Sequence, residues 1–142
     1  MFTSILVPFD GSQGAEAALA KAAELCGAGL TLLTVYRHHS LLEASMHMVR
    51  PDQPDDLDEV MRGHAREVAE RGKVLAAEGG VSNPRAFVKA GPVARTITGF
   101  AREHGQDLIV IGSRGLGSLE GALLGSVSHK VTSLAETPVL VV

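Results

Sequence analysis

The sequence predicts a doubly wound α/β fold, in which helices cover both faces of one parallel sheet. The first observation is that short apolar runs alternate with longer segments of helical period, and that a final apolar run closes the chain. The second is that most of these runs carry little polar interruption, as expected for strands that are covered on both faces. The length of 142 residues predicts a single domain that spans residues 1–142.

Five segments are predicted to be strands because they are short, apolar and bounded by helical or turn-forming sequence. They span residues 4–9, 30–36, 84–89, 108–111 and 138–142. Since a crossover between two parallel strands is right-handed in nearly all proteins, few topologies remain for these five strands.

The first two intervening segments show the spacing of amphipathic helices. The apolar stripe of the first consists of Ala15, Ala18, Leu19, Ala22, Leu25 and Cys26. The stripe of the second consists of Leu57, Val60, Met61, His64, Val68 and Leu75. Because Cys26 closes the first stripe, we expect it to be a buried and inert thiol.

The other two helices carry clear start and stop signals. The third is predicted to have Pro92 in its first turn and Gly105 just beyond its end. Its buried stripe consists of Val93, Ile97, Phe100 and Ala101. The fourth is predicted to span residues 126–135, where Pro138 prevents its continuation.

Composition excludes several classes of partner. The net charge is -3 and the basic residues are scattered, which argues against binding to nucleic acid. No apolar run approaches the roughly 20 residues of a membrane span, so we expect a soluble protein that does not bind membranes. A single cysteine and an N-terminus without the features of a signal peptide indicate a cytoplasmic location.

Residues 37–56 form the one irregular stretch, with His38, His39 and His47 among them. A connection of this length is either a lid over a site or a surface loop, and both interpretations stay open. No histidine or cysteine pair has the spacing of a metal site, so no metal ligand is predicted.

Residues 111–130, "IGSRGLGSLEGALLGSVSHK", contain five glycines and four serines but only one arginine, and their only lysine is the last residue. The segment joins a predicted strand to a predicted helix. Backbone N–H groups of such a loop and helix start can bind an anion without a lysine. Neither the P-loop pattern nor the dinucleotide pattern G-x-G-x-x-G fits the segment. The loop is therefore expected to hold phosphate through backbone and hydroxyl donors.

What the segment does contain is Gly112, two residues, Gly115, nine residues, and then Gly125 with Ser126. This spacing resembles the nucleotide-binding signature of the universal stress protein family. The resemblance extends over the whole chain, because "VPFDGS", "TVY" and the closing "GSVSHKVTSLAETPVLVV" match family segments in family order. It implies a five-stranded parallel sheet of order 3-2-1-4-5, in a fold similar to that of the adenine nucleotide alpha-hydrolases.

The resemblance also implies a ligand and its site. The ligand is ATP, with magnesium carried by the nucleotide. Pro8, Asp10 and Val35 would surround the adenine and ribose. Gly112, Arg114 and Gly115 would lie along the ribose and phosphates. The phosphate tail would meet Gly125, Ser126, Val127 and Ser128.

Each of these residues also has a purely structural interpretation. Asp10, with Gly11 and Ser12, can form a turn and cap the first helix, and Val35 can be an ordinary core residue. Ser126 and Ser128 can be helix caps, Arg114 a solvated charge, and the glycines turn residues. Together, however, these interpretations do not explain why the chain contains a long glycine-rich loop.

The residues favour nucleotide binding over turnover, because few cations are available to neutralise a reacting phosphate. The first hypothesis is a nucleotide-dependent stress-response regulator whose ATP occupancy biases the loop 37–56 toward a protein partner. A slow ATP or phosphoester hydrolase and a nucleotide-free dimeric interaction protein remain as alternatives. The resemblance further implies a homodimer that pairs through the C-terminal strand, from Pro138 to Val142.

Overall fold

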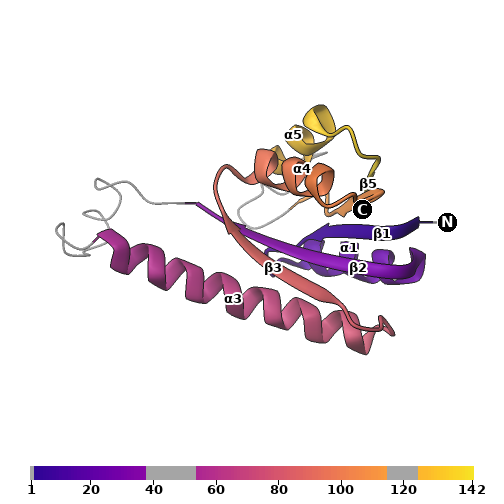
Figure 1. Ribbon diagram of the computed structural model, residues 1–142, viewed down its shortest axis with the longest axis horizontal. Coiled ribbons are helices and arrows are strands. Elements are labelled where there is room, and N and C mark those ends of the chain that lie inside the picture. Colours follow the sequence, from indigo (N-terminus) through magenta and orange to yellow (C-terminus); the bar gives the residue numbers. More distant parts are fainter. Residues whose placement is uncertain (1, 38–53, 115–124) are drawn as a thin grey trace.

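The computed structural model describes residues 2–37, 54–114 and 125–142. Its centre is a parallel sheet of five strands in the order β3-β2-β1-β4-β5, as predicted (Figure 1). The strands are β1 (Phe2–Pro8), β2 (Cys26–Tyr36), β3 (Arg85–Ala90), β4 (Leu108–Ile111) and β5 (Val139–Val141). This order places β1 beside β4 and leaves β3 and β5 at the two edges.

Helices cover both faces of the sheet, which confirms the doubly wound class. They are α1 (Gln13–Leu25), α3 (Pro54–Glu78), α4 (Val93–Glu103) and α5 (Ser126–Leu134). The helices α1 and α3 lie on one face, while α4 and α5 lie on the other (Figure 1). In the described part of the chain, no helix has the length and apolar character that crossing a bilayer requires.

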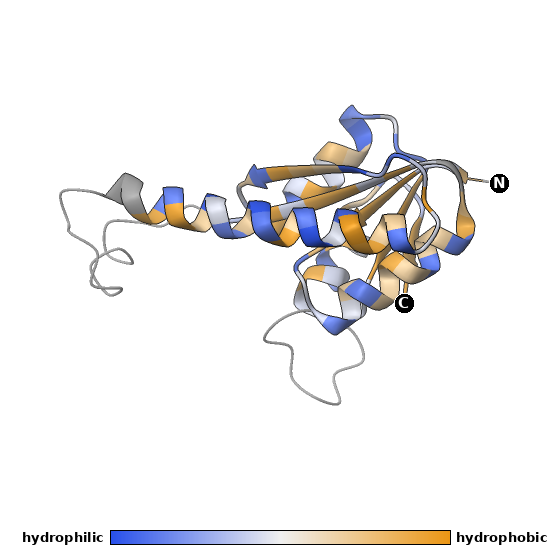
Figure 2. Ribbon diagram, turned by 90° about the horizontal axis from the view of Figure 1, so that it is seen from below, coloured by the Kyte–Doolittle hydropathy of each residue, from blue (hydrophilic) through white to orange (hydrophobic). Residues whose placement is uncertain are grey.

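The core forms two clusters, one on each face of the sheet, because side chains alternate along each strand. Ile5 and Val7 of β1 pack under α1 and α3, whereas Leu6 between them packs under α4 and α5. Figure 2 shows the strands hydrophobic along most of their length between helices of mixed character. The strand β4 is therefore buried on both sides along its length, and β1 is so from Ile5 to Val7, as their apolar runs predict.

The prediction that Cys26 belongs to the first helix is wrong. The helix α1 ends at Leu25, and Cys26 has the extended backbone of β2, opposite Phe2 of β1. The apolar period continues past the helix, but pairing with β1 provides the backbone partners that begin a strand here. The thiol is half-buried against the core rather than fully buried.

The predicted stripe of the second helix is only partly right. Val60 is 66% exposed and His64 is exposed, while Met61, Val68 and Leu75 are half-buried. The buried face of α3 consists instead of small residues: Ala65, Ala69, Gly72 and Ala76. A Cβ atom on Gly72 would lie 2.6 Å from Leu32 Cδ2 and 2.8 Å from Phe9 Cδ2. Small residues therefore let α3 approach the sheet closely, and the larger apolar side chains lie on its flanks.

Part of the predicted irregular stretch is helical, since α3 already begins at Pro54. His38, His39 and His47 lie outside the described residues.

The start of α1 lies directly against the segment that follows β4. A Cβ atom on Gly14 would overlap the carbonyl oxygen of Arg114. A Cβ atom on Gly112 would lie 2.6 Å from the carbonyl carbon of Gly14. Two backbones meet here without side chains between them, which requires glycine on both sides. This contact determines where the segment after β4 lies relative to α1.

Asp107, just before β4, joins the start of that strand to β1. Its carboxylate accepts hydrogen bonds from the N–H groups of Thr3 and Ser4, at 2.9 and 3.1 Å, and from the Thr3 hydroxyl. Partial burial acts to raise the pKa of Asp107, but these hydrogen bonds outweigh it and lower the pKa below its usual value.

Asp107→Ala is expected to lower the free energy of unfolding by about 1 kcal/mol at neutral pH, because the ionised carboxylate loses its donors. Since the folded-state pKa lies below the unfolded value, this contribution is present above the unfolded pKa of about 3.9 and disappears as pH falls through the folded value. Denaturant unfolding of both proteins at neutral pH and at successively lower pH measures the difference. A difference that stayed constant down to the lowest pH would contradict this role.

Gly14→Ala is expected to lower the free energy of unfolding by about 1–3 kcal/mol, because the new methyl group overlaps the Arg114 backbone. Gly63→Ala and Gly99→Ala are matched controls, because both glycines are helical and nothing lies within 4 Å of the added atom. Helix propensity predicts a gain of up to about 1 kcal/mol for each control. Thermal or denaturant unfolding makes the comparison, and equal behaviour of all three variants would rule out a critical contact at Gly14.

Candidate functional site

A cavity of about 130 Å³ lies at the carboxyl ends of β1, β2 and β4. Ligands in open α/β sheets bind at this end of the strands, where the strand order reverses. Nine of the predicted site residues line the cavity: Pro8, Asp10, Val35, Gly112, Arg114, Gly125, Ser126, Val127 and Ser128. Gly115 lies outside the described residues.

The inner wall of the cavity is apolar and comes from both the sheet and α4. Leu33 and Ile111 extend from the strands, and Val93 and Ile97 extend from α4. Helical spacing predicts only that Val93 and Ile97 belong to the core, because it does not reveal that one end of a buried stripe borders a cavity. The wall suits a flat apolar group such as a nucleobase.

Asp10 and Ser12 shape the turn between β1 and α1. The Asp10 carboxylate accepts a hydrogen bond from the Ser12 N–H at 2.9 Å, and Gly11 between them has φ +83°. The Ser12 hydroxyl accepts from the Ala15 N–H at 3.1 Å and so caps α1. The structural interpretation of Asp10, Gly11 and Ser12 is thus confirmed: Asp10 and Gly11 form the turn and Ser12 caps the helix. Asp10 is nevertheless exposed at the rim of the cavity.

Two hydrogen bonds fix the segment after β4 to the start of α5. The Ser128 hydroxyl donates to the carbonyl oxygen of Gly112, and the Gly125 N–H donates to the carbonyl oxygen of Ser113. Ser128 is 4% exposed. Because its hydroxyl hydrogen is used within the protein, Ser128 holds the two rims of the cavity together.

The start of α5 faces the cavity with backbone groups. Its N-cap is Gly125, and no side chain caps the helix. The interpretation of Ser126 or Ser128 as the cap of α5 is therefore wrong. The first N–H groups of a helix have no partner within the helix and carry a partial positive charge. The residues Ser126, Val127 and Ser128, which all line the cavity, therefore offer an anion site.

The ionisable side chains among the described lining residues are Asp10 and Arg114. Arg114 is exposed at the rim, and Lys130 is exposed but does not line the cavity. Within residues 2–37, 54–114 and 125–142, no three acidic, histidine or cysteine side chains gather in a way that would hold a metal ion. Chemically, the site combines an apolar slot with an uncapped helix start, which suits a ligand with a base and a phosphate.

Comparison with known proteins identifies relatives over the full length. The model of the "Universal stress protein family" matches residues 1–142. The universal stress protein YxiE of Bacillus subtilis is 36% identical over 148 aligned positions, which cover 100% of this chain and 99% of the relative. The structure of UspA from Lactobacillus plantarum has a TM-score of 0.81 at 27% identity, and the match covers 99% of this chain and 97% of UspA.

More distant structures share the fold. A universal stress protein in complex with cAMP has a TM-score of 0.72 at 23% identity, with 99% of this chain and 96% of that chain covered. A universal stress protein from Archaeoglobus fulgidus in complex with dAMP has a TM-score of 0.69 at 21% identity, with 99% and 97% covered. The full-length family match, the close relative and the shared topology lead to one conclusion: the chain belongs to the universal stress protein family.

Proposed function

We propose that the protein binds ATP, with magnesium carried by the nucleotide, in the cavity at the ends of β1 and β4. The observation that carries this proposal is that nine residues from β1, β2, the segment after β4 and the start of α5 border one cavity. Its apolar interior suits adenine and its helix start suits phosphate. The cAMP and dAMP complexes of two proteins with this fold support an adenine nucleotide as the ligand.

The size of the cavity suggests which part of the nucleotide would lie inside it and which part would lie at its mouth. Pockets that enclose a whole drug-sized ligand measure about 300–1,000 Å³. A cavity of about 130 Å³ is smaller and would enclose mainly the base. The adenine would lie between Val35 and Ile97, with Pro8 at the edge. The ribose and phosphates would lie at the mouth, along the glycine segment.

The phosphates would meet backbone donors and one cation. The donors at the rim are the N–H groups of Ser126 and Val127 and the Arg114 guanidinium. Gly112 and Gly115 would lie along the ribose and phosphates, as the family resemblance implies. Hydrogen bonds to a charged group are worth about 1.5–3 kcal/mol each, so a few donors suffice. Since a carboxylate repels phosphate, Asp10 would accept from ribose hydroxyls or meet the magnesium ion.

This site supports a regulator rather than an efficient enzyme. Phosphoryl transfer requires cations that neutralise charge and a group that positions the nucleophile. The described lining offers Arg114 and Asp10. We therefore propose a nucleotide-dependent interaction module of the cytoplasm, with occupancy of the site controlling a protein partner. Phosphate release over many turnovers that is lost in Asp10→Asn would instead establish the alternative, a slow hydrolase.

Gly125→Val is expected to weaken ATP binding more than tenfold, because the new side chain occupies the mouth of the cavity next to the α5 donors. The backbone of Gly125, with φ -66° and ψ 158°, accepts valine, so the variant is expected to fold. Titration calorimetry with magnesium-ATP measures the affinity, and Gly99→Ala serves as the control. Affinity unchanged in Gly125→Val would contradict phosphate binding at this helix start.

We further propose a homodimer that pairs through β5. This strand lies at an edge of the sheet, consists of Val139, Leu140 and Val141, and carries no charge. Leu140 is 36% exposed. An uncharged apolar edge is prone to pairing, and pairing with the same strand of a second copy satisfies both edges by two-fold symmetry.

Leu140→Lys is expected to give a monomer, because pairing would place two lysines in a shared apolar interface. Val74→Lys, which changes a 54% exposed residue on α3, is the matched control and is expected to remain dimeric. Light scattering after size-exclusion chromatography determines the mass. A dimeric Leu140→Lys variant, or a monomeric wild-type protein, would show that β5 is not the interface.

A further inference from the structure

The opposite edge of the sheet, β3, differs chemically from β5. Among residues 2–37, 54–114 and 125–142, β3 pairs with β2 alone. It carries Arg85 and Lys89, both exposed, whereas β5 carries no charged residue. Basic residues on an edge strand discourage pairing with a like-charged strand. The two edges are therefore suited to different partners.

The backbone of β3 can accept another strand. The Gly91 N–H donates to the carbonyl oxygen of Tyr36 in β2, at 2.9 Å. Because successive residues of a strand direct their backbone groups to opposite edges, those of Ala86, Val88 and Ala90 are directed away from β2. These groups form a short pairing edge.

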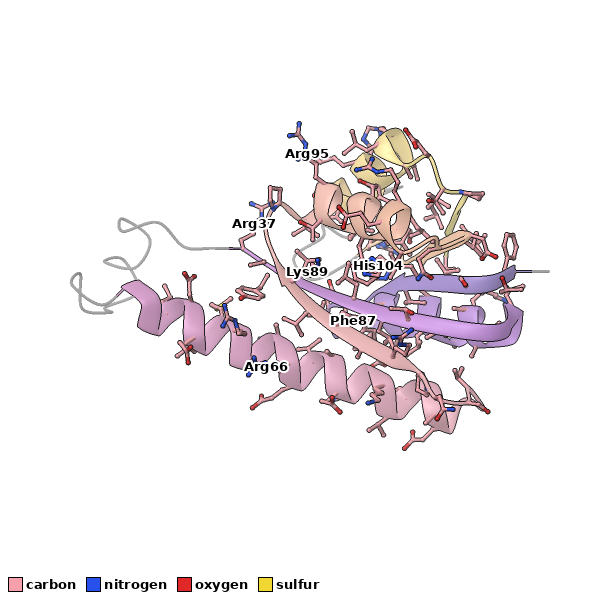
Figure 3. The ribbon with its side chains drawn as sticks, viewed as in Figure 1. Arg37, Arg66, Phe87, Lys89, Arg95 and His104 are labelled. Atoms are coloured by element: carbon pink, nitrogen blue, oxygen red, sulfur yellow. The ribbon has the colours of Figure 1, made fainter. Side chains whose placement is uncertain are left out.

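A hollow of about 730 Å³ lies beside this edge, on the face that α3 covers. Its floor includes the small residues Ala69, Ala86 and Ala90. Two cations of α3 line it, Arg62 and Arg66, against one carboxylate, Glu70. Lys89 borders it from β3, but its Nζ lies over the Phe100 ring on the other face of the sheet. Figure 3 shows that Arg66 comes from α3 and Lys89 from β3. The lining is thus apolar at its floor and positive in balance, although the whole chain has a net charge of -3.

Arg62 is held in place at this hollow. Its Nε donates to the Tyr36 hydroxyl at 2.9 Å. That hydrogen bond is the main cause that raises the pKa of Arg62 above its usual value, and nearby Glu59 and Asp58 contribute less. The guanidinium therefore provides a fixed positive charge rather than a freely rotating one.

The other face of β3 also presents cations in a regular arrangement. Arg85 lies over the Phe87 ring at 5.7 Å, and Lys89 lies over the Phe100 ring at 5.8 Å. The two rings are 5.4 Å apart. The Cα atoms of Arg85 and Lys89 are about 13 Å apart along an extended strand. A strand added beside β3 would therefore lie next to two cations on this face, with Arg85 near one end and Lys89 near the other.

We propose that the β3 edge and the adjoining α3 hollow bind an extended, acidic segment of a partner protein, which adds as a further strand to the sheet. The segment would alternate acidic and apolar residues. Its acidic side chains would lie on the α4 face near Arg85 and Lys89, and its apolar side chains would enter the hollow. Further acidic residues would meet Arg62 and Arg66.

The same charges argue against other occupants. Pairing of two β3 edges from two copies would bring the cations of each copy against those of the other, which is destabilising. Nucleic acid would use the cations but not the outward backbone groups of β3. The surface shares no lining residue with the nucleotide cavity, so the inference does not depend on the proposed ATP site.

The probe is a fluorescently labelled peptide of alternating glutamate and valine, titrated with the full-length protein and followed by anisotropy. The controls are a peptide of alternating lysine and valine, the glutamate peptide with its central valine replaced by proline, and a single-stranded DNA oligonucleotide. Saturable binding of the glutamate peptide alone is expected. Its binding should shift the amide resonances of Ala86, Val88 and Ala90.

Two protein variants separate charge from strand pairing. The double variant Arg66→Glu with Lys89→Glu is expected to weaken binding at least tenfold, whereas Lys21→Glu on α1 is expected to change it less than about twofold. Val88→Pro removes an outward N–H, which an edge strand tolerates, and is expected to abolish binding while the protein remains folded by circular dichroism.

Three outcomes would overturn the proposal. The first is no saturable binding of the glutamate peptide up to about 1 mM. The second is equal binding of the proline-containing peptide or of the DNA, which would show a surface for polyanions rather than a pairing edge. The third is undiminished peptide binding in folded Val88→Pro or in the double charge variant.

Discussion

The candidate site depends on one close contact between two backbones, at Gly14 of α1 and at Gly112 after β4. The contact determines where the chain leaves β4, and the hydrogen bonds from Ser128 and Gly125 then join that segment to α5. Donors at the start of α5 and the apolar wall of β2 and α4 are thereby held around one cavity. Preorganised donors of this kind bind an anion without the cost of ordering a loop.

The features that could be predicted from the sequence are those that arise from a local pattern of residues. A strand that is buried on both faces has an unbroken apolar sequence, as β4 does. The proline before α4 and the glycine after it indicate where this helix begins and ends. The glycine spacing at Gly112 and Gly125, with the family resemblance, pointed to residues that the fold gathers around one cavity. These features are predictable because each depends on residues close in the chain or on a recognisable motif.

Features that depend on tertiary contacts were not predictable. The helical period near Cys26 continues into a strand, because pairing with β1 outweighs local preference there. On α3 the hydrophobic pattern favoured large residues, whereas close approach to Phe9 and Leu32 requires the small residues on the buried face. Likewise, nothing in the sequence indicates that Gly14 meets Arg114, a residue 100 positions away, or that Ile97 borders the cavity. Such contacts join residues that are distant in sequence.

The most direct test of the proposed site is whether the wild-type protein binds ATP. Nucleotide released from denatured, freshly purified protein is to be identified by mass spectrometry, and the emptied protein titrated with magnesium-ATP by calorimetry. We expect an adenine nucleotide near one per chain, or saturable binding with measurable heat. Absence of both, at several temperatures, would show that the glycine segment has only a structural role.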